Sequence, residues 1–132
     1  MNAAWAKEWV ESYSKPDTLA EMYADDAQFE DVILPHKANG KEAIRKAYAA
    51  GVDPKYGVHT FAFVAYSGNT DGGVVEWTWD GKNMKKLLSV PAEGKEISTR
   101  GVSILTFKNG KIATQQDYWN AAAALRQLGA IK

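Results

Sequence analysis

From residue 58 onward the apolar pattern of this chain has a period of two, whereas most of the preceding sequence has the 3.6-residue period of helices. Before the change, Trp5, Trp9 and Tyr13 recur at i, i+4 and i+8, which predicts an amphipathic helix over residues 3–14. After it, the alternation predicts strands at 58–66, 73–80, 96–107 and 111–119. Helices followed by consecutive strands indicate an α+β fold with a curved antiparallel sheet, and argue against a parallel α/β sheet.

Capping and turn residues complete this pattern. Capped by Asp17 or Thr18, a short helix is predicted to end at Tyr23, followed by a turn at 24–26. Next come a strand at 27–34, a loop at 35–40 and a helix at 41–51 with Gly51 as its C-cap. Asn109-Gly110 is the strongest hairpin signal, and a tail helix at 121–128 closes on Gly129.

Composition narrows the possible chemistry. The 132 residues carry 16 Lys and Arg, 16 Asp and Glu, two His and no Cys. Balanced charge argues against nucleic-acid binding, and the lack of Cys excludes thiolate nucleophiles and Cys-based metal sites. We expect a single domain over residues 1–132, no cofactor, no metal and no membrane association. The N-terminal residues resemble neither a signal peptide nor a membrane span, so the expected location is the cytoplasm.

Two carboxylates lie inside predicted strands rather than in turns. Alternation places Asp117 on one face with Gln115 and Trp119, and Asp31 on one face with Phe29 and Ile33. If the Asp117 face is inward, burial would raise the pKa of that carboxyl and suit it to acid/base work. The alternatives are an exposed strand or a helix cap for Asp117, and a strand-end residue that binds loop amides for Asp31.

Other polar and aromatic residues support a pocket more than a named catalytic motif. Ser103 has no His at a spacing that would activate it, so at most it donates a hydrogen bond to a ligand. Trp77 and Trp79 share one strand face, which indicates core or the wall of an apolar pocket. His36 and His59 are interpreted as surface or structural residues.

Three segments carry a family resemblance: Tyr23–Asp31 (YADDAQFED), Gly40–Arg45 (GKEAIR), and Glu93-Gly94-Lys95 followed by Arg100–Ile112. In this order and spacing the chain resembles the superfamily of nuclear transport factor 2, ketosteroid isomerase, limonene-epoxide hydrolase and the SnoaL-like polyketide cyclases. The resemblance implies a cone in which a strongly curved mixed or antiparallel sheet wraps N-terminal helices around one apolar pocket. It also implies a homodimer through the outer sheet face.

At the positions that match the family's site residues, this chain keeps some of those residues and replaces others. Asp117 matches the general acid/base of the SnoaL-like cyclases and Asp31 the proton-shuttling carboxylate of ketosteroid isomerases. However, Ser103 stands where the cyclases have His, and Trp9 and Ser103 stand at the oxyanion-hole positions of the isomerases. We therefore do not expect steroid isomerisation at a useful rate. The Arg and Asp required by epoxide hydrolases are also missing from residues 76–79.

The leading hypothesis is a cofactor-independent SnoaL-like isomerase, cyclase, lyase or hydrolase acting on a small, largely apolar carbonyl or cyclic substrate. Asp117 would move the proton, Asp31 would be a second acid/base or an orienting carboxylate, and Gln115 and Ser103 would donate hydrogen bonds to a developing oxyanion. The expected pocket walls are Trp9, Tyr13, Phe29, Trp77 and Trp119. The alternative is a non-catalytic module of the same fold that binds a small molecule or dimerises.

Overall fold

The main sheet has six strands in the order β2-β1-β8-β7-β4-β3, and only β1 and β8 pair in parallel. The computed structural model describes all 132 residues. The strands of this sheet are β1 (Tyr23–Asp31), β2 (His36–Asn39), β3 (Val58–Gly68), β4 (Gly72–Lys82), β7 (Ile97–Lys108) and β8 (Lys111–Trp119). A separate hairpin consists of β5 (Lys86–Leu87) and β6 (Val90–Pro91). The architecture is α+β with a mixed, mostly antiparallel sheet, as predicted, and the sheet is open.

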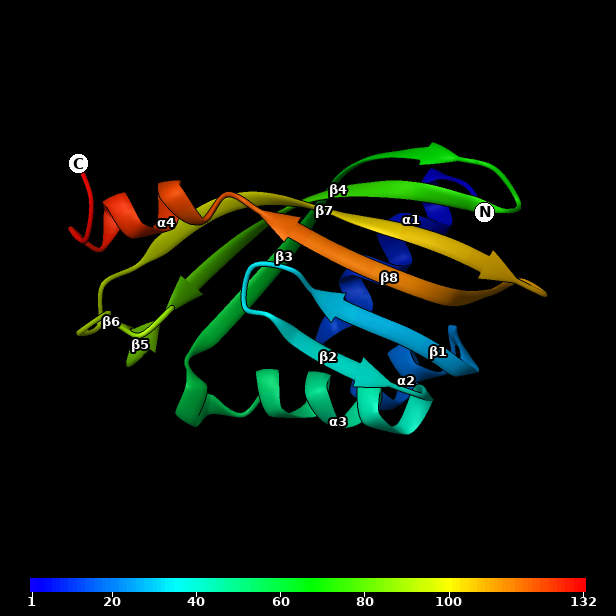
Figure 1. The fold of residues 1–132 in the computed structure, drawn as a ribbon, viewed down its shortest axis with the longest axis horizontal. Coiled ribbons are helices and arrows are strands. Elements are labelled where there is room, and N and C mark those ends of the chain that lie inside the picture. Colours follow the sequence, from blue (N-terminus) through cyan, green and yellow to red (C-terminus); the bar gives the residue numbers. More distant parts are fainter.

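The helices are α1 (Ala3–Glu11), α2 (Pro16–Ala20), α3 (Lys41–Gly51) and α4 (Ala121–Gln127), with short 3-10 helices η1 (Ser12–Ser14) and η2 (Pro54–Tyr56). Of these, α1 packs against β3, α3 against β1 and β2, α2 against α3, and α4 against β7. Figure 1 shows the long strands crossing the molecule, with α1 behind them, α3 along one side and α4 near the C-terminus. Trp9 and Val10 of α1 and Ile44 of α3 are buried in the core between helices and sheet. None of the helices is long and apolar enough to cross a membrane.

The predicted period-two pattern is confirmed in β4. Trp77 and Trp79 are 5% and 8% exposed, whereas Asp80 on the other face is exposed. The Asn109-Gly110 hairpin is confirmed as well, since both residues have positive φ (52° and 75°) between paired Lys108 and Lys111. Such a turn matches the twist of the two strands that it connects.

Four local predictions were wrong. The second helix begins at Pro16 and ends at Ala20, so Asp17 and Thr18 lie inside it rather than capping it, and Tyr23 is the first residue of β1. Residues 24–26 form no turn but lie within β1, where the pairing with β8 shifts register between Tyr23 and Gln28. The predicted loop at 35–40 contains β2, which pairs with the end of β1. Gly51 is a helical residue rather than a C-cap, and a side chain there would meet the Tyr13 hydroxyl at 2.6 Å. In the last three cases a tertiary contact determines the local structure.

Candidate active site

Asp117 lies at the centre of the sheet, between carboxyl and hydroxyl side chains on its two neighbouring strands. Its Cα pairs with that of Asp31 in β1 and with that of Ser103 in β7. Residues that pair directly across adjacent strands place their side chains on the same face. The three side chains therefore meet on the inner face of the sheet, although they are widely separated in sequence.

Two neighbours hold one oxygen of Asp117. The Ser103 hydroxyl donates to Oδ1 at 2.5 Å, and the Gln115 amide nitrogen donates to the same atom at 2.9 Å. No protein group donates to Oδ2, and Asp117 lines a cavity of about 420 Å³. One carboxyl oxygen is thus fixed, while the other is available to a ligand.

Burial raises the pKa of Asp117 from 3.8 to about 7. The hydrogen bonds from Ser103 and Gln115 oppose this shift, and the negative charge of Asp31 adds to it. A buried carboxyl favours its neutral form because the anion loses hydration. Near neutral pH this group can therefore both accept and release a proton, as general acid/base catalysis requires.

The raised pKa makes a prediction about stability. The folded state binds the Asp117 proton more tightly than the unfolded state does. The stabilisation that this proton provides is therefore complete below pH 4 and is lost as the pH rises to about 7. The loss amounts to at most about 4 kcal/mol. Urea unfolding of wild type and Asp117→Asn between pH 4 and 8 should show the variant gaining relative stability with pH. A difference that does not change with pH would contradict the raised pKa.

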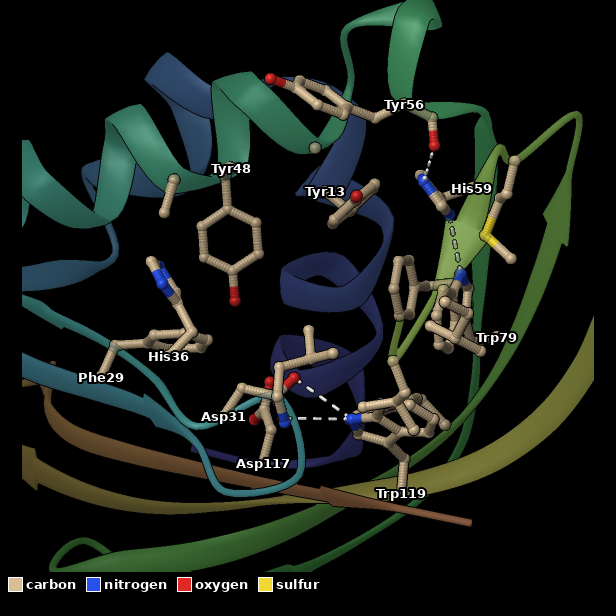
Figure 2. Close-up of a pocket in the computed structure, with 18 of the residues that line it drawn as sticks. Tyr13, Phe29, Asp31, His36, Tyr48, Tyr56, His59, Trp79, Asp117 and Trp119 are labelled. Carbon is tan, nitrogen blue, oxygen red and sulfur yellow. Dashed lines mark hydrogen bonds between the residues drawn. The ribbon is translucent and has the colours of Figure 1, made fainter. Parts of the chain in front are cut away.

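Asp31 is fixed by three donors. Its Oδ1 accepts from the backbone N–H groups of Ile33 and Leu34, each at 3.0 Å, and the Trp119 indole N–H lies 3.1 and 3.2 Å from its two oxygens. Figure 2 shows Asp31 beside Asp117, with Trp119 reaching it from the other side. Asp31 thus binds loop amides, as one of the two interpretations from sequence expected, and it also lines the cavity.

A chain of hydrogen bonds joins Asp117 to two tyrosines through the Gln115 side chain. Gln115 donates to the Tyr48 hydroxyl at 3.0 Å as well as to Asp117, and its amide oxygen accepts a short hydrogen bond from Tyr23. The hydrogens of the amide group are therefore engaged within the protein. Tyr23 also accepts from the Trp9 indole at 3.3 Å, which ties the network to α1.

Tyr48 is the functional candidate that sequence reasoning missed. The Tyr23 hydroxyl has one hydrogen, which it donates to Gln115. The hydroxyl oxygens of Tyr23 and Tyr48 lie 3.4 Å apart, so the only partner of the Tyr48 hydrogen within the protein is this long contact. Burial raises the pKa of Tyr48 well above 10, which keeps the hydroxyl protonated. In Figure 2 this hydroxyl points from α3 across the cavity toward Asp31 and Asp117. In the sequence, Tyr48 has the helical spacing of the apolar residues of segment 41–51, and that spacing does not distinguish a site residue from a core residue.

The expected wall residues line two adjoining cavities. Tyr13, Phe29, Trp77 and Trp119 line the cavity of about 420 Å³. Trp9, Ser103 and Gln115 line a smaller one of about 60 Å³, and the two cavities share Tyr13, Tyr48, Phe61, Trp77 and Asp117. Trp79 also lines this cavity, in keeping with the strand face that it shares with Trp77. Wall residues that the sequence did not assign to the pocket include Phe61, His36, His59, Met84 and Leu88.

Each indole N–H of the walls is bound within the protein. Trp77 donates to Ser103 at 2.9 Å, and Trp79 donates to His59 Nδ1 at 3.0 Å. The second nitrogen of His59 lies 3.1 Å from the Tyr56 carbonyl oxygen, so both ring nitrogens have partners. The indole rings thus present carbon atoms to the cavity, while their N–H groups are hydrogen-bonded to residues of the surrounding strands. Nowhere do three His, Cys, Asp or Glu side chains gather as metal ligands would.

Gly101 lets Trp77 reach Ser103. It pairs with Trp77 on β4 and Trp119 on β8, and an added Cβ would lie 2.4 Å from the Trp77 ring and 2.8 Å from the Tyr118 carbonyl oxygen. Gly101→Ala should lower the free energy of unfolding by about 1–3 kcal/mol, the usual cost of overpacking. Urea unfolding measures the loss, and near-UV circular dichroism should report the displaced indole. Unchanged stability and spectrum would show that the sheet absorbs a methyl group here.

The sequence matches the family model of the SnoaL-like domain over residues 3–115. The chain belongs to this family. Since the match ends before Asp117, the role of this residue in the SnoaL-like chain depends on its geometry and not on the match. A search of curated proteins found no match.

Solved structures share the fold of this SnoaL-like chain at low sequence identity. TsrD from Streptomyces laurentii has a TM-score of 0.79 at 20% identity, covering 97% of this chain and 95% of that one. A protein of ketosteroid isomerase-like fold from Catenulispora acidiphila DSM 44928, in complex with trimethylamine, has a TM-score of 0.75 at 18% identity (93% and 90% covered). IdmH from Streptomyces antibioticus, described as a candidate polyketide cyclase, has 0.76 at 14% identity (98% and 99%). The family is one with cofactor-free enzymes.

Proposed function

We propose that this SnoaL-like protein is a cofactor-independent enzyme that moves a proton on a small, largely apolar carbonyl or cyclic substrate. One observation carries the proposal: Asp117 presents a free carboxyl oxygen to an aromatic-walled cavity, and burial raises its pKa to about 7. Buried carboxyls with such a pKa are common at sites of acid/base chemistry. Isomerase, cyclase, lyase and hydrolase activities all fit this first step.

In this proposal Tyr48 is the hydrogen-bond donor to the substrate and Asp117 is the general base and acid. The Tyr48 hydroxyl donates its hydrogen to the substrate carbonyl oxygen, and ionised Asp117 takes a proton from the adjacent carbon. The C–H electron pair moves into the C–C bond and the carbonyl electrons move to oxygen, which gives an enolate held by Tyr48. Asp117 then returns the proton to carbon. A hydrogen-bond donor that faces the developing negative charge stabilises the transition state strongly where water is excluded.

Ser103 and Gln115 act on Asp117 rather than on the ligand. Sequence reasoning expected them to donate to an oxyanion, but their hydrogens are directed to Asp117 and Tyr48. Both side chains are 1% exposed. They fix the carboxyl plane so that Oδ2 faces the substrate, while the negative charge of Asp31 favours the protonated form of Asp117.

Deuterium exchange tests this function even though the natural substrate is unidentified. Small ketones such as cyclohexanone and 2-decanone are incubated with the protein in D₂O near pD 7, and NMR measures the loss of α-proton signal. The proposal expects exchange above the buffer rate that saturates with ketone concentration. Exchange at the buffer rate for cyclic and linear ketones alike would contradict it.

A second candidate function is binding of an organic cation without chemistry. Aromatic rings and the Asp31 carboxylate surround the same cavity, and aromatic cages with a nearby anion recognise alkylammonium groups. The relative from Catenulispora acidiphila holds trimethylamine. Titration with trimethylammonium, followed by Trp fluorescence, should saturate if this candidate is right.

The outer face of the sheet fits the expected homodimer. Val74, Ile104 and Tyr118 are 40%, 41% and 39% exposed on neighbouring strands of that face. Exposed apolar side chains gathered on one face are typical of association surfaces. We propose a homodimer through this face, and a cytoplasmic location as predicted from the sequence.

A further inference from the structure

The β5–β6 hairpin at the cavity is built on an unfavourable backbone. Leu87 pairs with Val90, so Leu88 and Ser89 alone make the turn, and their φ angles are 50° and 65°. Two-residue turns with two positive φ angles are usually Asn-Gly, because a larger side chain there crowds the following carbonyl oxygen. A leucine is among the least suitable residues for this position.

The hairpin does not need Leu88 in order to form. Met84 and Leu87, which are 3% and 6% exposed, anchor it in the core, and the Ala92 N–H donates to the Lys85 carbonyl at 2.9 Å. An Asn-Gly turn would keep this pairing without strain. Strained residues persist mainly at ligand sites, so the leucine side chain is the feature to explain.

The Leu88 side chain contributes apolar surface to the cavity. It is half-buried, packs against the core and lines the cavity together with Met84 and Leu87. None of the hydrogen bonds that hold Asp117, Gln115 or Tyr48 involves this hairpin. The wall that it forms can therefore contact the part of a ligand that does not react.

We propose that Leu88 is a specificity-determining residue that contacts the hydrocarbon part of the ligand and favours long or bulky apolar groups. This inference uses one part of the proposed function, namely that the ligand binds in this cavity. The ligand class that follows is a molecule with one polar reacting group and an extended hydrocarbon portion.

The test compares Leu88→Asn with Glu93→Asn. Both replace a residue at positive φ by one that tolerates it, but Glu93 (φ 54°) is exposed and lies outside the cavity wall. Binding of the methyl ketones from 2-pentanone to 2-decanone is followed by Trp fluorescence. Wild type and Glu93→Asn should bind about threefold to fourfold more tightly for each added methylene. Leu88→Asn should lose about tenfold for 2-decanone and less than twofold for 2-pentanone.

Thermal unfolding separates this role from a structural one. Glu93→Asn should raise the Tm by about 3 °C through relief of strain, and Leu88→Asn should stay folded with a Tm near that of wild type. Equal affinity of Leu88→Asn and wild type for 2-decanone would overturn the proposal, as would wild-type binding that does not depend on chain length. Because binding is read without turnover, failed deuterium exchange would contradict the proposed function but leave this result intact.

Discussion

Replacing Asp117 by Asn should reduce protein-catalysed deuterium exchange by about 10²–10⁴, the usual contribution of a general acid/base. Asn has the same shape, and its side-chain oxygen can still accept from Ser103 and Gln115, as Asp117 Oδ1 does. Its amide then occupies the place of the free oxygen and cannot take a proton from carbon. NMR of ketone α-protons in D₂O measures the loss.

Asp80→Asn is the matched control for this substitution. Asp80 is exposed on the opposite face of the sheet, so the same change in charge there should leave exchange unaltered. Asp117→Asn should also unfold at a higher temperature than wild type at pH 8, where the buried carboxylate is ionised. Wild-type exchange rates in Asp117→Asn would remove this residue from the mechanism.

Replacing Tyr48 by Phe should lower the exchange rate by about 10²–10³, as loss of an oxyanion donor does in other enzymes. The ring would still fill the wall of the cavity, but no hydroxyl would face the substrate carbonyl. One Gln115 N–H would lose its partner, at a cost of about 1 kcal/mol in the free energy of unfolding. Exchange kinetics and urea unfolding measure the two effects separately.

Tyr66→Phe is the control for the loss of a hydroxyl. The Tyr66 hydroxyl is buried without a hydrogen-bond partner and lies outside both cavities. Its removal should keep full exchange activity and leave stability equal or higher, since no hydrogen bond is lost. If Tyr48→Phe behaved in the same way, Tyr48 would be a wall residue only, and the enolate would need another donor.

Sequence reasoning placed most elements because their signals are local. The alternation around Trp77 and Trp79, the Asn109-Gly110 turn and the αL glycine at 129 each depend on a few neighbouring residues. The elements that it missed depend on distant partners. The start of β1 is set by β8, and Gly51 accommodates a tyrosine from the N-terminal segment.

The candidate site was predictable in its carboxylates but not in its network. Asp31 and Asp117 stood out because both lie inside predicted strands rather than in turns, and Asp31 shares its face with apolar residues. That they are paired neighbours follows from the parallel β1–β8 register, which a pattern cannot reveal. Tyr48 gave no signal of its own because a half-buried tyrosine on a helix has the same spacing as a core residue. Likewise, no local motif predicts the positive φ of Leu88.

The parallel pairing of β1 with β8 also governs when the site comes into being. Asp31 and Asp117 are far apart in the sequence, yet their Cα atoms are direct partners in the sheet. In the sheet order, β8 and β7 lie between β1 and β4, so β1 and β2 cannot join the other strands until β7 and β8 are in place. Pairing over so long a sequence separation is slow, and we therefore expect the two carboxylates to come together late in folding, after the local hairpins have formed.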